Sequence, residues 1–487
     1  MKRRSILRGR RAALLCIIAV GCVPLATRVP IAATVGRQQP PSAERARSAR
    51  PNIIFIMADD LGVGHLGCYG QTRIRTPNID RLAQQGLRFA QAYAGCTVCA
   101  PSRSTLMTGL HMGHTPVRLN PGGIPLRASD ITVAEVLKKA GYATGIFGKW
   151  GLGDARTTGV PEKHGFDESF GYLHQVHAHF YYPDYLWKNG AKFILQENSG
   201  GKRGRYSHDL IVSEALDFVR AHRDRPFFLY LAPTIPHLEL LVPEDSLDEY
   251  RGRFPETPFH DPRGHYADQA TPHAAIAGMI TRLDRGVGQL MSLLEELNLD
   301  KNTIVFFTSD NGAQNGYATD PDFFKATGLF RGYKQDFYEG GIRVPMIIRW
   351  PGRVRPGRMT DQIWAHWDFM PTAAEVAGSR APSNVDGISL LPTILDKQQK
   401  QHSFYYWEFG DAAKLAQAVR AGDWKGVRTR PGVALELYDL KADPGEKRNV
   451  AADHPDVAAR IEKILRTARV DPPPQIEPPK EPGKSYQ

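Results

Sequence analysis

Five short apolar segments, each followed directly by polar or small residues, constrain the fold of this chain more than any other feature. They span residues 52–57, 143–148, 226–232, 303–309 and 344–350. Segments of this length and composition are typical of strands that are buried on both faces of a sheet. Because helical patterns separate them, the sequence predicts an α/β domain in which a mostly parallel sheet lies between helices.

Three of the intervening stretches carry clear helix signals. Thr76 and Pro77 are suited to the cap and the first position of one helix. Thr132 and Glu135 have the spacing of a capping box at the start of another. Residues 271–297 keep apolar side chains at helical spacing, which predicts a long helix packed on the sheet.

The composition changes near residue 384, where small and polar residues dominate. Short alternating stretches with turn signals follow at residues 402–409, 417–429 and 434–447. A helical pattern covers 455–468. We therefore expect residues 51–385 to form the larger domain and 386–470 a smaller α+β domain, with a disordered Pro-rich tail at 471–487.

The first fifty residues differ in charge from the rest. The chain has 62 Lys and Arg against 51 Asp and Glu, a formal net charge of +11, but residues 1–50 hold 11 of the positive side chains and one Glu. The remaining residues are therefore nearly neutral as a group. The basic composition gives no reason to expect a nucleic-acid partner.

Residues 1–33 have the pattern of a secretory signal peptide, with a cationic head and an apolar run at 12–26 that is short for a membrane span. We expect 34–50 to be a flexible linker and the mature chain to have no transmembrane span. The expected location is periplasmic or secreted. Ordinary cleavage is favoured over a lipoprotein at Cys22, and the choice between Sec and twin-arginine export stays open.

Three cysteines, Cys68, Cys96 and Cys99, follow the signal peptide, too few for a disulfide framework. Cys96 and Cys99 have CxxC spacing, which also occurs in redox and metal sites. Pro101, however, is suited to the first turn of a helix, so Cys99 is expected just before a helix N-terminus. Backbone N–H groups there favour an anion, and Arg103 adds a positive charge. Cys96 is more simply a small buried residue.

Polar residues follow two of the predicted strands at the point where each ends. Asp59 and Asp60 come after the first strand, and Asp310 and Asn311 after the fourth. Sites in open α/β sheets form at the carboxyl ends of the strands, and oxygen ligands of this kind suit Ca²⁺ or Mg²⁺. The alternative is that these residues only cap a helix and form a turn.

The segment Cys99 to Arg103, "CAPSR", followed by "STLMTG", resembles the sulfatase signature CxPSR, whose cysteine is oxidised to formylglycine during export. The resemblance continues in "PNIIFIMADDLG", "GKWGLG", "GFDESFGY", "PTIPH", "TSDNG" and "GYKQDFYEGGIRVPMIIRWPG". It implies an arylsulfatase-like, formylglycine-dependent sulfatase with an alkaline-phosphatase-like α/β domain and a smaller C-terminal α+β domain. A formylglycine-generating maturation enzyme is then an expected partner.

The resemblance also implies the residues of the site. Calcium, with magnesium as the alternative, would be bound by Asp59, Asp60, Asp310, Asn311 and the modified Cys99. One hydroxyl of hydrated formylglycine would attack sulfur, and the other would later expel sulfate. Arg103 and Lys149 would hold the formylglycine and the sulfate. Lys334 and His237 would bind sulfate and protonate the leaving alcohol. Asp310 would help deprotonate the attacking hydroxyl.

The sequence departs from the family pattern at Gly151. Many sulfatases read GKWHLG, with a histidine that assists the elimination step, whereas this chain reads GKWGLG. His111, His114 and His177 are candidates for its role, as is a water molecule. His177 lies in a stretch rich in imidazoles and aromatic rings, residues 174–187, which suits a sugar, so it is the predicted substrate contact.

The leading hypothesis is an exported, divalent-cation-dependent sulfatase that hydrolyses a sulfate monoester on a carbohydrate. A phosphonate or phosphodiester hydrolase shares the fold and the CxPSR motif and is the first alternative. A degenerate protein that binds sulfated glycans without hydrolysing them is the second, suggested by Gly151.

Overall fold

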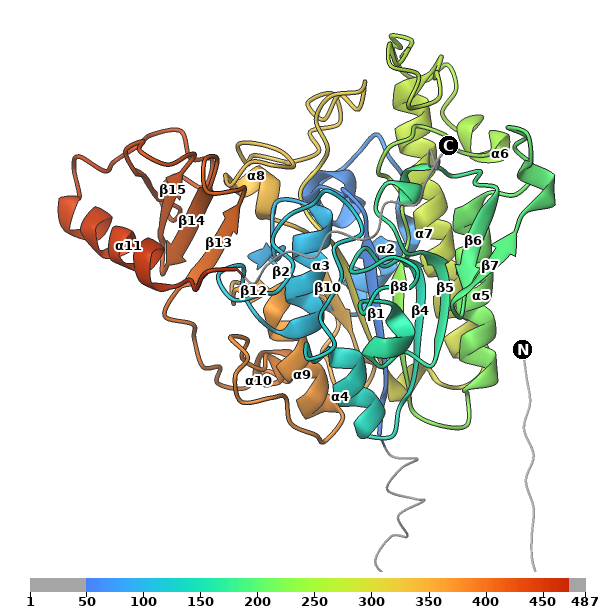
Figure 1. The fold of residues 1–487 in the computed structure, drawn as a ribbon, viewed down its shortest axis with the longest axis horizontal. Helices are drawn as coiled ribbons and strands as arrows, with labels where there is room; N and C mark the ends of the chain where they lie inside the picture. The colour runs from blue at the N-terminus through green and yellow to red at the C-terminus, as the bar shows by residue number, and fades with distance from the viewer. Residues whose placement is uncertain (1–49, 473–487) are drawn as a thin grey trace, which may run out of the picture. The chain divides into compact units, whose positions relative to one another are not determined.

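The computed structural model describes residues 50–472 (Figure 1). The predicted signal peptide, the possible lipid-attachment residue Cys22, the linker up to residue 49 and the tail from residue 473 lie outside the described part. Within that part, none of the helices combines the length and the apolar character needed to cross a membrane.

A mixed sheet of ten strands forms the centre of the larger domain. Its middle five strands are parallel, in the order β9 (Thr303–Ser309), β1 (Asn52–Ala58), β8 (Phe227–Ala232), β4 (Ala143–Lys149) and β5 (Glu168–Tyr172). Four of these coincide with the predicted strands to within one residue. The mostly parallel sheet expected from the sequence is therefore confirmed.

Shorter strands extend the sheet at both edges. Beyond β9 lie β10 (Met346–Arg349), β2 (Leu87–Phe89) and β11 (Arg358–Thr360), and beyond β5 lie β6 (Tyr185–Lys188) and β7 (Ala191–Ile194). The fifth predicted strand, β10, runs antiparallel to β9. Its composition indicated burial on both faces correctly but carries no information on strand direction.

Alternate residues of β1 point into two separate hydrophobic layers. Ile54 and Ile56 pack with helices α2 (Pro77–Gln84), α5 (Ser207–Ala221) and α7 (Pro272–Glu296). Ile53 and Phe55 pack on the other face with α3 (Cys99–Thr108), α4 (Val133–Lys139) and α9 (Phe369–Val376). Helices thus cover both faces of the sheet, as Figure 1 shows. The remaining helices of the larger domain are single turns, α6 (Glu244–Leu247), α8 (Glu339–Ile342) and α10 (Leu391–Ile394).

The helix signals in the sequence correspond to real helix starts. Thr132 accepts the backbone N–H of Glu135, whose side chain accepts the N–H of Thr132, so the capping box is formed. The prediction for α3 was two residues late, because the helix begins at Cys99 rather than at Pro101. Pro101 is still compatible with this start, since the first turn of a helix has no internal partners for its N–H groups.

The smaller domain is an antiparallel sheet of four strands with one helix. The strands β13 (Tyr405–Phe409), β14 (Ala416–Ala421), β15 (Trp424–Arg428) and β16 (Glu436–Asp439) pair in chain order. Helix α11 (Pro455–Thr467) buries Ile461 and Leu465 against this sheet. The predicted α+β architecture is confirmed.

A buried ion cluster joins this sheet to the larger domain. Lys425 of β15 lies 2.9 Å from a carboxylate oxygen of Glu339 in α8 and 2.9 Å from one of Glu446. All three side chains are fully buried. Removing Lys425 would leave two buried carboxylates without this cation, so the ion pairs favour the packing of β15 against α8.

Candidate functional site

The carboxyl ends of β1, β4 and β9 bring together the polar residues that the sequence singled out. Asp59 and Asp60 follow β1, Lys149 is the last residue of β4, and Asp310 and Asn311 follow β9. All five are buried, with exposed fractions of 1% or less. The parallel strands therefore position one compact polar site, as the topology of an open α/β sheet predicts.

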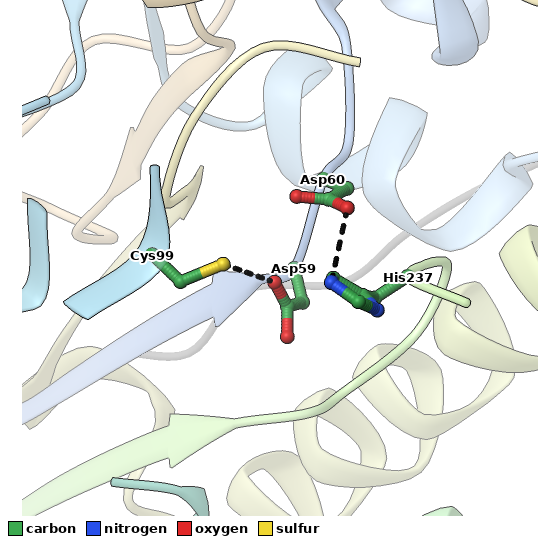
Figure 2. A group of neighbouring side chains, drawn as sticks. All are labelled: Asp59, Asp60, Cys99 and His237. Carbon is green, nitrogen blue, oxygen red and sulfur yellow. Dashed lines mark hydrogen bonds and ion pairs between the residues drawn. The ribbon is translucent and has the colours of Figure 1, made fainter. Parts of the chain in front are cut away.

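Cys99 lies at the N-terminus of α3 and points into this site. Its Sγ is 3.5 Å from Oδ1 of Asp59. Figure 2 marks this contact with a dashed line. Burial raises the pKa of the Cys99 thiol, and the negative charge of Asp59 raises it further. A thiol that is held protonated is a weak nucleophile, so the unmodified side chain is poorly suited to nucleophilic attack.

Cys96 has a different environment, although it is only three residues away. Its Sγ lies 3.7 Å from the carbonyl oxygen of Glu408 in β13 and packs among side chains of the smaller domain. Its direction toward that sheet agrees with the interpretation that Cys96 is a buried packing residue. Cys68, Cys96 and Cys99 are all unpaired in the structure.

Each carboxylate of the site has a cationic partner. Lys149 Nζ lies 2.6 Å from Oδ2 of Asp59, and Lys334 Nζ lies 2.8 Å from Oδ2 of Asp60. Arg103 Nη2 lies 2.7 Å from Oδ2 of Asp310 and 3.7 Å from Oδ2 of Asp59. Burial lowers the pKa of Lys334, but the nearby negative charges, of which Asp60 has the largest effect, raise it more, so the net pKa is raised. The lysine therefore stays charged.

His237 completes the group from the loop after β8. Its Nε2 lies 3.5 Å from Oδ2 of Asp60, a contact that Figure 2 marks with a dashed line. Its Nδ1 is 2.7 Å from the carbonyl oxygen of Leu238. Burial lowers the pKa of His237 well below its ordinary value, and the nearby charges of Lys334 and Lys149 lower it further. Because the carbonyl accepts the Nδ1 hydrogen, a second proton taken up by the ring would sit on Nε2, facing the carboxylates.

The carboxylate and amide oxygens of the site suit a hard divalent cation. The ligating atoms of Asp59, Asp60, Cys99 and His237 all lie within 4.8 Å of one another. Asn311 supplies the clearest sign, because its buried Oδ1 has no hydrogen-bond partner while its Nδ2 donates to Oδ1 of Asp60 at 2.7 Å. A buried oxygen that no protein group satisfies, beside carboxylates, suits coordination to calcium or magnesium.

The structure also identifies supporting residues that sequence reasoning missed. Ser102 Oγ donates to the carbonyl oxygen of Asp310 at 2.5 Å and accepts the backbone N–H of Gly95. His366 Nδ1 lies 3.2 Å from the same hydroxyl, and burial lowers the pKa of His366 to about 3. These contacts tie the end of β9 to α3. Ser102 is part of the "CAPSR" segment, but nothing in the sequence near His366 indicates this contact.

A second imidazole stacks on His237. The ring of His179 lies 4.4 Å from the ring of His237, and its Nδ1 is 3.0 Å from the hydroxyl of Tyr266. His177, the predicted substrate contact, lies two residues away in the same 3-10 turn and packs instead against Tyr172 and Tyr185. The density of histidines in residues 174–187 correctly indicated that this segment lies near the site. It did not indicate which of the histidine rings contacts His237.

The space beside Gly151 is filled by Gln175. Gly151 has φ +78°, and a Cβ built there would lie 2.8 Å from Nε2 of Gln175. Gln175 Nε2 donates to Oδ1 of Asn120 at 3.3 Å, and the same oxygen accepts the N–H of Ala100 at the start of α3. Two amide side chains, rather than a histidine, therefore support the helix end next to Cys99.

Two of the histidines considered as replacements lie away from this helix end. His111 and His114 come after the last residue of α3, Thr108, and so lie at the opposite end of a ten-residue helix about 15 Å long. Their rings stack at 4.4 Å, and His114 Nδ1 is 2.9 Å from Asp386. This position argues against a role for either of them at Cys99.

Family models match nearly all of the described chain. A model described as Sulfatase matches residues 51–379, and a model described as N-sulphoglucosamine sulphohydrolase, C-terminal, matches residues 328–471. The first match alone covers more than half of the chain, and the second includes the whole antiparallel sheet of the smaller domain.

Individual relatives agree with these models. The N-acetylgalactosamine-6-O-sulfatase of Bacteroides thetaiotaomicron is 30% identical over 87% of this chain and 94% of that protein. The N-acetylgalactosamine-6-sulfatase of Rattus norvegicus is 34% identical over 85% of each chain. The solved structure of Ps i-CgsB in complex with k-i-k-neocarrahexaose has a TM-score of 0.74 and 27% identity, over 86% of this chain and 92% of that chain.

The contact between Gly151 and Gln175 gives a testable prediction. Gly151→His would place a non-glycine residue in a left-handed backbone conformation, and its Cβ would clash with Gln175. We therefore expect the free energy of unfolding to fall by about 2–4 kcal/mol. Urea denaturation measures this loss. Gly151→His combined with Gln175→Gly should recover about half of it.

Gly200→His is the matched control, because Gly200 has φ +72° and an added Cβ there meets nothing within 4 Å. This variant isolates the backbone cost, expected at about 1–2 kcal/mol. Equal losses for the two single variants would contradict the view that Gln175 occupies the space beside Gly151.

Proposed function

The chain is a member of the sulfatase family and a sulfate-ester hydrolase, and from this premise we propose that it removes sulfate from a carbohydrate sulfate monoester. We further propose that the nucleophile is a formylglycine derived from Cys99 and that calcium, or magnesium, takes part. The carbohydrate assignment is supported by relatives named N-acetylgalactosamine-6-sulfatases and by a structural neighbour solved with a neocarrahexaose.

The environment of Cys99 is the observation that carries this proposal. A buried residue at a helix N-terminus, 3.5 Å from the carboxylate of Asp59, lies where an anionic ester would meet backbone N–H groups and cationic side chains together. The thiol itself is held protonated by burial. A hydrated aldehyde at residue 99 would instead supply hydroxyl groups for attack on sulfur.

The proposed cation ligands are Asp59, Asp60, Asp310, Asn311 and the modified residue 99. The unpartnered buried Oδ1 of Asn311 supports this set, since coordination would satisfy an oxygen that otherwise has no partner. When bound, the cation would lower the pKa of a hydroxyl on residue 99 and polarise the sulfate.

The remaining charged residues have roles that follow from their positions. Arg103 and Lys149 would hold residue 99 and the sulfate, since both lie among the carboxylates at the ends of β1 and β9. Asp310, whose charge acts on the Cys99 side chain, would accept the proton of the attacking hydroxyl. Lys334 and His237 would bind sulfate and protonate the leaving alcohol, His237 through a second proton that its Nε2 takes up when the anionic ester is bound.

Two further parts of the proposal rest on the sequence. Export is proposed from residues 1–33, and a formylglycine-generating enzyme is the proposed maturation partner because Cys99 lies in the "CAPSR" segment. His177 stays a predicted substrate contact. It packs against Tyr185 and lines the cavity described below.

Sulfate release is the direct test of the reaction. Protein from a host with the maturation enzyme should release sulfate from defined sulfated saccharides, measured by ion chromatography, and Cys99→Ala should reduce the rate by at least about 10³-fold because the nucleophile is gone. Cys68→Ala, at a partly buried cysteine outside the site, is the matched control and should retain activity.

The same preparation separates the sulfatase from its closest alternative. Rates on aryl sulfate, phosphate diester and phosphonate esters should favour the sulfate ester. Phosphorus substrates that react faster by orders of magnitude would contradict the proposal, as would strong hydrolysis by Cys99→Ala. Tight binding of a sulfated glycan with no sulfate release, by the matured and metal-loaded protein, would instead support the binding-protein alternative.

Removal of the cation should abolish activity reversibly. Dialysis against a chelator should stop sulfate release and lower the Tm, and added Ca²⁺ should restore both. Asn311→Ala should raise the Ca²⁺ concentration needed for half restoration by on the order of tenfold or more, because one oxygen ligand is lost. Asn384→Ala, at an exposed asparagine, should need the same Ca²⁺ concentration as the protein without a substitution. Equal activity with and without chelator would contradict the assigned ligand set.

A further inference from the structure

A cavity of about 560 Å³ lies beside the proposed reaction site. Phe180 and Ala267 form part of its wall. Their neighbours in the chain, His179 and Tyr266, are joined by a hydrogen bond of 3.0 Å, and His179 stacks on His237. Phe180 and Ala267 in the cavity wall are therefore the sequence neighbours of the two residues that link this region to His237.

The cavity has the apolar surfaces that a sugar ring requires. Tyr182 and Tyr185 line it and are half-buried, as is Phe180. Tyr185 is fixed by the ring of His177 at 4.5 Å, and Tyr182 by the ring of Tyr206 at 5.3 Å. Aromatic faces held in place in this way can pack against the C–H face of a saccharide.

Acceptors for sugar hydroxyl groups are also present. Glu239 lines the cavity with an exposed fraction of 6%, and its Oε1 accepts the backbone N–H of Tyr181 at 3.1 Å. Asp184 lines the outer part and is exposed. Carboxylates accept hydrogen bonds from hydroxyl groups, so they favour a polyhydroxylated ligand over an apolar one.

Two cationic side chains at the cavity have no partner in the described part of the chain. Lys202 and Arg203 line it and are exposed, and no ion pair or hydrogen bond joins either side chain to another described residue. Arg203 lines the cavity together with Tyr182 and Glu239, and its positive charge acts to lower the pKa of both. By contrast, Arg205 in the same loop pairs with Glu197 at 3.4 Å.

We propose that this cavity binds a second monosaccharide of the substrate that carries a carboxylate or sulfate, recognised by Lys202 and Arg203. The inference rests on the proposed function and narrows it, because the substrate is then an acidic oligosaccharide rather than a single sulfated sugar. The sulfate to be removed lies at the carboxyl ends of the strands, and the neighbouring acidic sugar lies against Tyr182, Tyr185 and Glu239.

Three substrates test this subsite: a sulfated hexosamine monosaccharide, the same sugar joined to a uronic acid, and the same sugar joined to a neutral hexose. We expect kcat/KM for sulfate release to be on the order of tenfold higher for the uronate disaccharide than for the neutral one, the effect of one charge-assisted contact. In Lys202→Ala/Arg203→Ala, the ratio of the two values should fall to about one. Arg205→Ala, the matched control in the same loop, should keep the original ratio.

Two results would overturn the subsite: equal kcat/KM for the two disaccharides, or a preference for the uronate that survives in Lys202→Ala/Arg203→Ala. A chain that releases no sulfate from any substrate would contradict the proposed function itself. In that case calorimetric binding of the uronate disaccharide decides the subsite. Binding to the protein without a substitution that is lost in Lys202→Ala/Arg203→Ala supports the subsite. No binding to the protein without a substitution overturns the subsite.

Discussion

Three buried carboxylates, Asp59, Asp60 and Asp310, meet at the carboxyl ends of β1 and β9, and the rest of the site is arranged around their charge. Lys149, Lys334 and Arg103 each lie within 2.8 Å of one of them. Removing one member of such a buried pair typically costs about 3–5 kcal/mol, because the partner is left uncompensated. The same cations are the groups that would face an anionic ester, so charge balance in the resting site and substrate binding use the same residues.

The parts of the site that are local in sequence were predictable. Asp59, Asp60, Asp310 and Asn311 follow apolar segments directly, and the rule that sites form at the carboxyl ends of parallel strands brings them together. Cys99 was identified from its helix and its motif. The fold class followed from the same alternation of strands and helices, although strand direction at β10 did not.

Contacts between distant segments could not be predicted in the same way. Gln175 fills the space beside Gly151 because the loop after β5 folds back onto the end of β4, and no periodicity or capping signal encodes that path. His179 rather than His177 stacks on His237 for the same reason. Residues two apart in a 3-10 turn point in different directions, and the composition of the loop does not indicate which one faces the site. The role of Lys334 could be predicted only from the resemblance to sulfatases, because Lys334 does not directly follow a predicted strand.

The conversion of Cys99 to an aldehyde is the central claim, and mass spectrometry of the peptide that contains residue 99 tests it most directly. The protein should be produced with and without a formylglycine-generating enzyme and treated with an aldehyde-reactive hydrazide before digestion. We predict hydrazide labelling at residue 99 only in the first preparation, with sulfate release rising in proportion to the labelled fraction. Full sulfatase activity from protein in which residue 99 is an unmodified cysteine would contradict the claim.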